Sequence, residues 1–238
     1  MGDNDLCAVA LEHLPPCLHE EHTQFPCVEA VCTEDSDDVL MRAQERRKQL
    51  LCPPAVIHNI VSTSLIQASC TPINLSNLAM LLPCSCYDRR KFAAITIRID
   101  NPKCTALLFT SGKLVVTGVK SWYECLLAAI MVSRLLQRVL LGNSYAIVNC
   151  DVQNIVAHTE LQLVSGQCLN IQTMYENLAM ECTYQPTMFP GLIYRPINAP
   201  VVLLLFYSGK IVLTGGKTVN DISGGWQSLW PIVKQYVY

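Results

Sequence analysis

The sequence predicts an α+β fold that is built from two similar halves. Residues 92–120 and 189–217 align without gaps and share 13 identities in 29 positions, and Asn59-Ile60-Val61 recurs as Asn154-Ile155-Val156. In both halves, short apolar strands flank a Ser-Gly turn, which is typical of a β-hairpin. A longer helical segment follows the hairpin in each half. These observations indicate a duplicated unit of roughly 90 residues.

The first half has the order strand, helix, three strands, helix. We expect these elements over Val56–Leu65, Leu75–Leu82, Phe92–Ile99, Thr105–Phe109, Lys113–Thr117 and Ser121–Leu141. Ser121 and Glu124 have the spacing of a capping box, so they mark the start of the long helix. Gly142 marks its end.

The second half repeats this order. We expect its elements over Tyr145–Leu163, Ile171–Met180, Leu192–Ile197, Val201–Phe206, Lys210–Thr214 and Thr218–Tyr236. Gly224 and Gly225 lie within the last of these segments, and glycine is a poor helix former. We therefore expect the closing helix of this half to be interrupted and less regular.

The charge distribution separates the first 54 residues from the rest. Residues 1–54 contain 11 acidic and 4 basic side chains, a net charge of −7, whereas residues 55–238 contain 8 and 13, a net charge of +5. Pro53-Pro54 marks the boundary. We expect an acidic, flexible segment over 1–54, a first repeat over 55–142 and a second over 143–238. A polyanionic partner or ordinary solvation explains the positive charge equally well.

Composition excludes several classes of protein. The chain is 51% hydrophobic and 15% charged, so it is not disordered as a whole. We find neither an apolar run of about 18 residues nor a secretory signal, and we expect a soluble intracellular protein. No Cys-x-x-Cys pair occurs among the 13 cysteines, so we expect most of them to be buried thiols. An N-terminal zinc site remains an alternative, with the candidate ligands His13, Cys17, His19, His22, Cys27 and Cys32.

The chain contains no catalytic signature. Gly-x-Gly-x-x-Gly, a phosphate-loop lysine, His-Glu-x-x-His and a nucleophile elbow are all missing from the sequence. His58 and His158 border strands but match no catalytic pattern. We therefore expect no enzyme activity, no cofactor, no metal and no small-molecule substrate.

The predicted strands are apolar on both faces. Leu107 and Phe109 lie on one face of their strand, and Ala106 and Leu108 lie on the other. The helices of each half can cover only one of the two faces. The other face is an apolar patch, which usually marks a binding surface. A dimer partner or the N-terminal segment could cover it instead.

The residues of this second face suit the minor groove of DNA. They comprise aromatic pairs, two amides, branched or hydroxyl side chains, and cations that recur in register in the two halves. At A·T pairs the minor groove presents only acceptors, so a protein reads it through width, apolar contact and a few donors. The cations, which include Lys120 and Lys217, would neutralise phosphates.

These residues resemble the TATA-box-binding protein family over about 55–238. The matching stretches begin at Asn59, Arg90, Thr105, Phe189 and Val202, the last being Val-Leu-Leu-Leu-Phe-Tyr-Ser-Gly-Lys-Ile-Val-Leu-Thr-Gly. The resemblance implies a saddle, with one curved ten-stranded antiparallel sheet that binds DNA on its concave face and carries four helices on its convex face. It also implies a nuclear general transcription factor that bends A·T-rich promoter DNA and nucleates the pre-initiation complex.

The resemblance also implies a role for each site residue. The wedges that insert between bases are Phe92, Phe109, Phe189 and Phe206. The groups that hydrogen-bond central base edges are Asn59, Asn154, Thr117 and Thr214. The residues that pack on the groove floor are Val61, Val115, Val156, Val212, Leu107 and Leu204. The residues that contact the DNA backbone are Arg98, Arg195, Ser111, Ser208, Lys113 and Lys210. For each Phe the alternative is a core position, and for the cations a solvated edge.

The sequence departs from the family on the side away from DNA. The implied partners are transcription factors IIA and IIB and the TBP-associated factors. The stretch 184–188 lacks the acids through which family members contact factor IIB, and the first long helix has only two cations, Arg134 and Arg138. Ala93 and Pro190 keep the asymmetry between the halves. An alternative is therefore a paralogue that binds general transcription factors with weak or no TATA binding.

Overall fold

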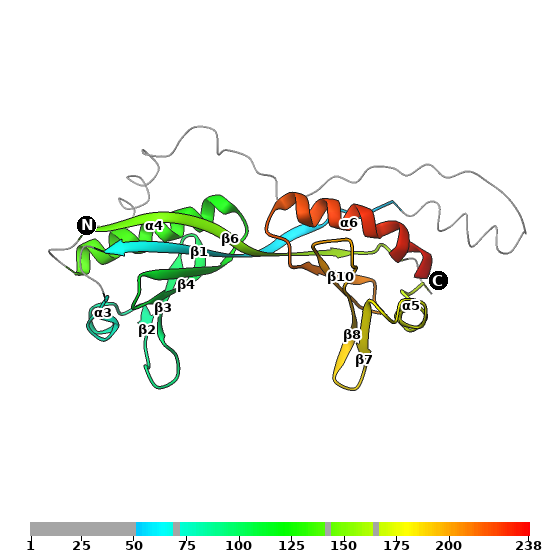
Figure 1. Ribbon diagram of the computed structural model, residues 1–238, viewed down its shortest axis with the longest axis horizontal. Helices are drawn as coiled ribbons and strands as arrows, with labels where there is room; N and C mark the ends of the chain where they lie inside the picture. The colour runs from blue at the N-terminus through cyan, green and yellow to red at the C-terminus, as the bar shows by residue number, and fades with distance from the viewer. Residues whose placement is uncertain (1–50, 69–71, 141–143, 164–166) are drawn as a thin grey trace, which may run out of the picture. The chain divides into compact units, whose positions relative to one another are not determined.

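The computed structural model describes residues 51–68, 72–140, 144–163 and 167–238 (Figure 1). These residues form two compact units. Unit 1 contains residues 59–154, and unit 2 contains residues 155–238 together with the described residues up to His58. The segment 1–50, which contains the candidate zinc ligands, lies outside the described residues.

Unit 1 follows the order predicted for the first half, with one additional short strand. Its elements are most of β1 (Val56–Ala68), α3 (Leu75–Leu81), β2 (Ser85–Cys86), β3 (Ala94–Asp100), β4 (Lys103–Phe109), β5 (Lys113–Val119), α4 (Trp122–Val139) and the first part of β6 (Tyr145–Glu160).

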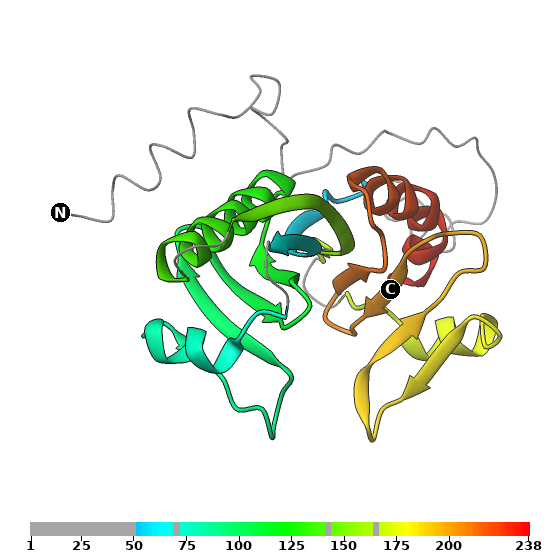
Figure 2. The same cartoon turned by 60° about the vertical axis from the view of Figure 1, so that its left-hand side comes forward.

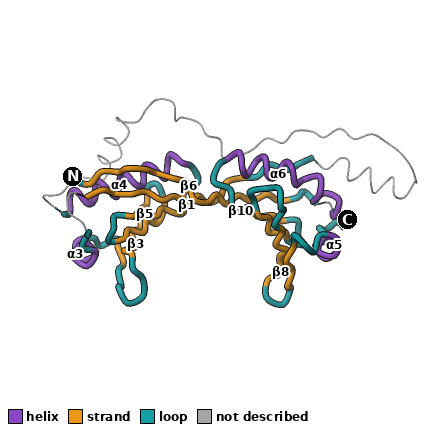
Figure 3. The backbone as a smooth tube through the Cα atoms, viewed as in Figure 1, coloured by secondary structure: helices purple, strands orange, loops and turns teal. Residues whose placement is uncertain are grey.

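Unit 2 repeats this order. Its elements are the end of β6, α5 (Ile171–Asn177), β7 (Cys182–Gln185), β8 (Phe189–Tyr194), β9 (Val202–Leu205), β10 (Lys210–Thr214), α6 (Val219–Val233) and the 3-10 turn η2 (Lys234–Tyr236). Within each unit, the loop that joins β2 to β3 or β7 to β8 extends away from the long helix (Figures 2 and 3).

The ten strands form one antiparallel sheet. Their hydrogen-bonded order is β2-β3-β4-β5-β1-β6-β10-β9-β8-β7. The central strands β1 and β6 are equivalent in the two repeats, and β5, β4, β3 and β2 on one side of them correspond to β10, β9, β8 and β7 on the other. Four α-helices accompany these strands in the described part of the chain. The predicted α+β fold of two repeats, with a ten-stranded antiparallel sheet and four helices, is confirmed.

Helix α4 covers one side of the strands in unit 1. Leu114 and Val116 of β5 are fully buried beneath it. Ser133 on α4 donates a hydrogen bond to the carbonyl oxygen of Tyr145 on β6 at 2.6 Å, which ties the helix to that strand. The predicted capping box of α4 is present, because Ser121 and Glu124 each bond the backbone N–H of the other. The core of unit 1 therefore lies between α4 and the sheet.

Both predicted Ser-Gly turns close a hairpin. Gly112 and Gly209 each have a φ of +84°, which glycine adopts without steric cost. The N–H of Gly112 donates to the carbonyl of Phe109, and the N–H of Gly209 donates to that of Phe206, at 2.9 Å each. A Cβ atom at Gly112 would collide with the carbonyl oxygen of Ile66, so this turn requires glycine.

Several predicted boundaries were wrong. Strand β3 begins at Ala94, so Phe92 precedes it, whereas β8 begins at Phe189. Strand β8 ends at Tyr194 because Pro196 follows closely and has no N–H to continue a ladder. The short strands β2 and β7 had no clear sequence pattern. Helix α5 ends at Asn177 rather than near Met180.

The prediction of an interrupted closing helix was also wrong. Helix α6 runs unbroken from Val219 to Val233, and Thr218 and Asp221 form its capping box. Gly225 faces the core, where an added Cβ atom would lie 2.6 Å from Val201 Cγ2. Glycine at this position therefore lets the helix approach the strands. No helix in the described ranges is long and apolar enough to span a membrane.

Candidate nucleic-acid interface

Each unit has strand side chains on the face opposite its buried core, which we call its open face. In unit 1, the open face includes Val61, Leu107, Val115 and Thr117, all of them half-buried. They alternate with fully buried neighbours along β1, β4 and β5. Because successive side chains of a strand point to opposite faces, these four project on the same side of the sheet. The structure thus brings together the predicted groove-floor residues of unit 1.

The strand register orders these side chains into rows. Val61 lies opposite Thr117, Thr117 opposite Thr105, and Thr105 opposite Arg98. Directly opposed residues have Cβ atoms about 4.5–5.5 Å apart, so this row is continuous across four strands. The neighbouring row consists of Thr63, Val115, Leu107 and Thr96. The open face of unit 1 therefore consists of apolar and hydroxyl side chains, and its first row ends at the cation Arg98.

Unit 2 has an open face of the same construction. His158 lies opposite Val212, Val212 opposite Leu204, and Leu204 opposite Ile193. All four side chains are half-buried. The predicted residues on this face are Val156, Leu204, Val212 and Thr214, and each is half-buried.

The predicted wedges form one aromatic pair in each unit. The ring centroids of Phe92 and Phe109 are 6.1 Å apart with planes at 63°, and those of Phe189 and Phe206 are 5.7 Å apart with planes at 69°. Edge-to-face contact of this kind is favourable for aromatic rings. Phe92 is 48% exposed and Phe189 is 36% exposed, which is unusual for large apolar side chains. The two pairs therefore carry apolar surface that the fold itself does not bury.

Gly191 explains how the second aromatic pair fits against β8. A Cβ atom there would lie 2.7 Å from Phe189 Cε1 and 3.0 Å from Phe206 Cε1. Ala94 occupies the matching position in unit 1 and pairs with Phe109. A glycine therefore lies against the aromatic pair of unit 2, whereas an alanine occupies the equivalent position in unit 1.

The direction of the Asn59 amide is fixed by its hydrogen bonds. Its Oδ1 accepts from the backbone N–H of Gly118 at 2.7 Å and from Thr117 Oγ1 at 3.4 Å. A backbone N–H can only donate, so it selects the oxygen of the amide as its partner. The Nδ2 group of Asn59 is thereby left to donate to an acceptor outside these bonds. Asn154, the counterpart of Asn59 in the second repeat, and Thr214, the counterpart of Thr117, are both half-buried.

The predicted backbone-contacting residues are all exposed. They are Arg98, Ser111, Lys113, Arg195, Ser208 and Lys210. None of the four cations in this set has an ion-pair partner among the described residues. These cations can therefore contact an external anion without first breaking an ion pair.

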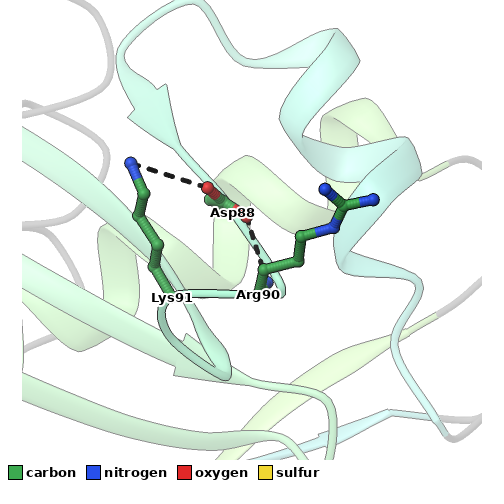
Figure 4. A network of polar contacts seen from close by, with 3 residues as sticks. All are labelled: Asp88, Arg90 and Lys91. Atoms are coloured by element: carbon green, nitrogen blue, oxygen red, sulfur yellow. Dashed lines mark hydrogen bonds and ion pairs between the residues drawn. The ribbon is translucent and has the colours of Figure 1, made fainter.

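A further basic segment precedes the first wedge. In the loop before Phe92, Asp88 accepts from the backbone N–H of Arg90 at 3.0 Å and pairs with Lys91 at 3.8 Å (Figure 4). The guanidinium of Arg90 points away from this carboxylate in the same view. The matching residues of unit 2, 185–188, include no charged side chain. The segment before the first wedge is therefore charged, whereas the matching segment of unit 2 is not.

Three cysteine side chains, Cys104, Cys125 and Cys182, lie buried in the described part of the chain. Burial raises the pKa of the Cys104, Cys125 and Cys182 thiols to about 11, which keeps these groups protonated and unreactive at neutral pH. No three His, Cys, Asp or Glu side chains in the described ranges are placed to hold a metal ion.

Our sequence-based set missed several residues of the open faces. Thr63 and His158 are the next side chains after Val61 and Val156 on the same face, so strict alternation along the strand would have identified them. Gly191 was missed because its role depends on a contact between two rings, which no local pattern records.

Comparison with known proteins identifies similar chains. The family model described as "Transcription factor TFIID (or TATA-binding protein, TBP)" matches residues 55–139 and 149–236. The TATA-box-binding protein of Acanthamoeba castellanii is 38% identical over 185 residues, which cover 76% of this chain and 66% of that protein, just under two thirds of its length. TATA-box-binding protein-like 1 of Entamoeba histolytica is 38% identical over 180 residues, which cover 76% of this chain and 79% of that protein. The structure of Methanococcus jannaschii TBP aligns with a TM-score of 0.60 at 29% identity, covering 75% of this chain and 97% of that one.

Proposed function

Because this chain belongs to the TATA-box-binding protein family, whose members are transcription factors rather than enzymes, we propose that it binds and bends A·T-rich duplex DNA through the minor groove. In this role it nucleates a transcription pre-initiation complex in the nucleus. The observation that carries the proposal is the exposure pattern. None of the fourteen residues assigned to wedging or groove contact is fully buried, although most lie on strands whose intervening residues are.

The chemistry of the open faces supports this proposal. Valine and leucine side chains offer apolar contact to the groove floor, and Asn59 offers a donor where A·T pairs present acceptors. Proteins that bind the minor groove frequently insert apolar side chains between base steps, which costs a few kcal/mol that the added contact area must offset. The partly exposed Phe pairs supply part of that area. Salt dependence should follow from the exposed cations, because phosphate contacts release counterions.

A titration on a TATA duplex and on a scrambled duplex tests the proposal. We expect tighter, salt-dependent binding to the TATA duplex, with bending measured by fluorescence resonance energy transfer. Replacing Phe189 and Phe206 by Ala should strongly reduce the bend, whereas replacing Met188, which is 82% exposed in the adjacent loop, should not. An unchanged bend in the double variant contradicts the wedge assignment.

The protein partners included in the proposal are transcription factor IIA, factor IIB and the TBP-associated factors. Residues 184–188, which comprise the end of β7 and the turn before β8, contain no acid, so contact with factor IIB through this stretch is weakened. Adding factors IIA and IIB to the preformed DNA complex tests each partner. A stable complex with factor IIB that is lost when these side chains are truncated to Ala contradicts the weakened contact.

A second candidate function is that of a paralogue that binds general transcription factors with weak or no TATA binding. The similarity to TATA-box-binding protein-like 1 and the two departures, in residues 184–188 and on α4, favour it. This candidate predicts binding of general factors in pull-downs and no mobility shift on A·T-rich probes. The duplex titration therefore separates the two functions.

A further inference from the structure

The open face of unit 2 carries a pair of histidines. The ring centroids of His58 and His158 are 5.5 Å apart, and the ring planes meet at 84°. His58 is exposed and His158 is half-buried. In the strand ladder, His158 lies opposite Val212, a residue of the predicted site. The histidine pair therefore borders the candidate interface.

The duplication provides an internal comparison for this pair. The offset of 95 residues that aligns Asn59 with Asn154 also aligns His58 with Gln153 and Thr63 with His158. In unit 1, Gln153 Nε2 donates to Thr63 Oγ1 at 2.7 Å. The same two strand positions are thus in contact in both units. Unit 1 has an amide and a hydroxyl at these positions, whereas unit 2 has two imidazoles. Of these groups, only imidazole is of a type that changes its charge between pH 5 and 8.

We propose that His58 and His158 form a further nucleic-acid contact of unit 2 and that the pair takes up one proton when DNA binds. This inference rests on the proposed function and adds two residues to its site. It makes the two repeats differ in how their DNA contacts respond to pH.

The chemistry of the groove favours the protonated form of the pair. The minor groove at A·T pairs presents acceptors and has an enhanced negative potential when it is narrow. A neutral imidazole offers one N–H donor, whereas an imidazolium offers two. A single charged ring is attracted to the face of its neutral neighbour, but two charged rings at this separation repel. The pair therefore gains one proton rather than two.

The charged groups of the protein near the pair do not supply the negative charge that bound DNA would supply. On β6, Glu160 follows His158 by two residues, so it points to the same side of the strand. On β10, Lys210 lies directly opposite Glu160, so the two charges offset each other. On β1, the residue next to His58 is the neutral Asn59. Phosphates of bound DNA then supply the negative charge that favours the added proton.

The test compares DNA affinity at pH 6 and pH 8 at constant ionic strength. The full chain and an A·T-rich duplex are used, with fluorescence anisotropy as the readout. We expect binding to be about threefold to tenfold stronger at pH 6, because one linked proton changes the binding constant by at most tenfold per pH unit. The variant His58→Gln/His158→Thr copies the pair of unit 1 and should have nearly equal affinity at both values. The reverse variant Thr63→His/Gln153→His should increase the ratio.

Calorimetry of the unmodified chain provides a second measurement that needs no variant. Binding heats in two buffers of different ionisation enthalpy should show an uptake of up to one proton per complex at pH 7. Equal affinity at both pH values, or a pH effect that persists in His58→Gln/His158→Thr, overturns the proton-linked contact. A chain that binds no A·T-rich duplex at either pH overturns the proposed function itself, so the two failures are distinguishable.

Discussion

Asn59 shows how a backbone group can fix the direction of a side-chain amide. The N–H of Gly118 holds its oxygen, so the amide nitrogen is committed to donation elsewhere. A groove that presents only acceptors requires this orientation. The residue type alone does not determine it, since an asparagine can turn either end of its amide outward.

Replacing Asn59 by Asp tests this orientation. The carboxylate can still accept from Gly118, but it offers no donor and brings a negative charge to the open face. We expect DNA affinity to fall on the order of tenfold or more, as measured by anisotropy on a TATA duplex. The control Asn77→Asp adds the same charge at an exposed position of α3 and should change the affinity far less. Equal losses in the two variants would show that only net charge matters.

For single residues, the sequence duplication gave the best predictions. It singled out Phe92 with Phe109, and Phe189 with Phe206, and the structure places each pair in ring contact. The roles of these residues in DNA binding remain predictions until the bend is measured. The sequence could not reveal the Asn59 amide orientation or the close support of a ring pair by Gly191, because both depend on contacts between distant residues.

Helix α6 shows that packing at the level of a whole element can override helix propensity. Two consecutive glycines lie in its middle, and the helix still runs from Val219 to Val233. Gly225 packs against Val201, whereas Gly224 is exposed, and a Cβ atom added there would meet nothing within 4 Å. Glycine is a poor helix former, and the close packing against the strands that Gly225 permits offsets this unfavourable contribution.

These two glycines form a matched pair of variants. Gly225→Ala should destabilise the protein by about 1–3 kcal/mol, because the added methyl group overpacks against Val201. Gly224→Ala should stabilise it by up to about 1 kcal/mol, because alanine is the better helix former and meets no neighbour. Urea unfolding of both variants measures the difference. The same sign for both would contradict the packing explanation.

The contact between β4 and α4 predicts sensitivity to alkaline pH. Burial is the main reason why the pKa of Cys104 and that of Cys125 are raised from 9.0 to about 11. The charge of Cys125 adds to the shift of Cys104, and the charge of Cys150 adds to the shift of Cys125. The unfolded chain therefore loses these protons at lower pH than the folded chain. The stability that the neutral thiols contribute is complete below about pH 9 and is lost as the pH rises through 11.

Urea midpoints between pH 8 and 11 measure this loss. The variant Cys104→Ala/Cys125→Ala should show a flatter pH dependence, although it is less stable at every pH because it leaves small cavities. Cys84 and Cys86 are exposed, so replacing them by Ser should leave the slope unchanged. A slope that is unaffected by removal of the buried thiols would exclude them as its cause.

The elements that the sequence predicted best were those with long periodic patterns or caps. Helix α4 and strand β10 fall within a few residues of their expected bounds. Strands β2 and β7 were missed because they are two and four residues long and have no apolar alternation of their own. They form because β3 and β8 offer free edges for pairing.

At the scale of the whole molecule, the two units do not coincide with the two repeats of the sequence. Strand β6 contributes residues up to Asn154 to unit 1 and the remainder to unit 2. Helix α4 in unit 1 bonds to this strand through Ser133 and Trp122, whose partners are the carbonyls of Tyr145 and Cys150. A repeat that ends at residue 142 lacks these partners.

A comparison of two fragments tests this dependence. We expect residues 51–160 to retain a folded unit 1, because the fragment includes the strand that α4 requires. Residues 51–142 should be much less stable, because the buried Tyr145 and the bonds to β6 are missing. Circular dichroism melts and amide exchange of α4 provide the measurement. Equal protection of α4 in both fragments would show that the repeat is self-sufficient.

The same sharing of β6 bears on how this chain can be recombined with its relatives. A chimaera joined near residue 142 would combine α4 from one parent with the strand that α4 packs against from the other, and the foreign seam would run through a core. A crossover between Asn154 and Ile155 instead keeps α4 and the part of β6 that belongs to unit 1 from one parent, and only residues 51–58 then meet unit 2 of the other parent. The boundary inherited from the duplication is thus a poor place to exchange parts, and a site inside the strand is the better one.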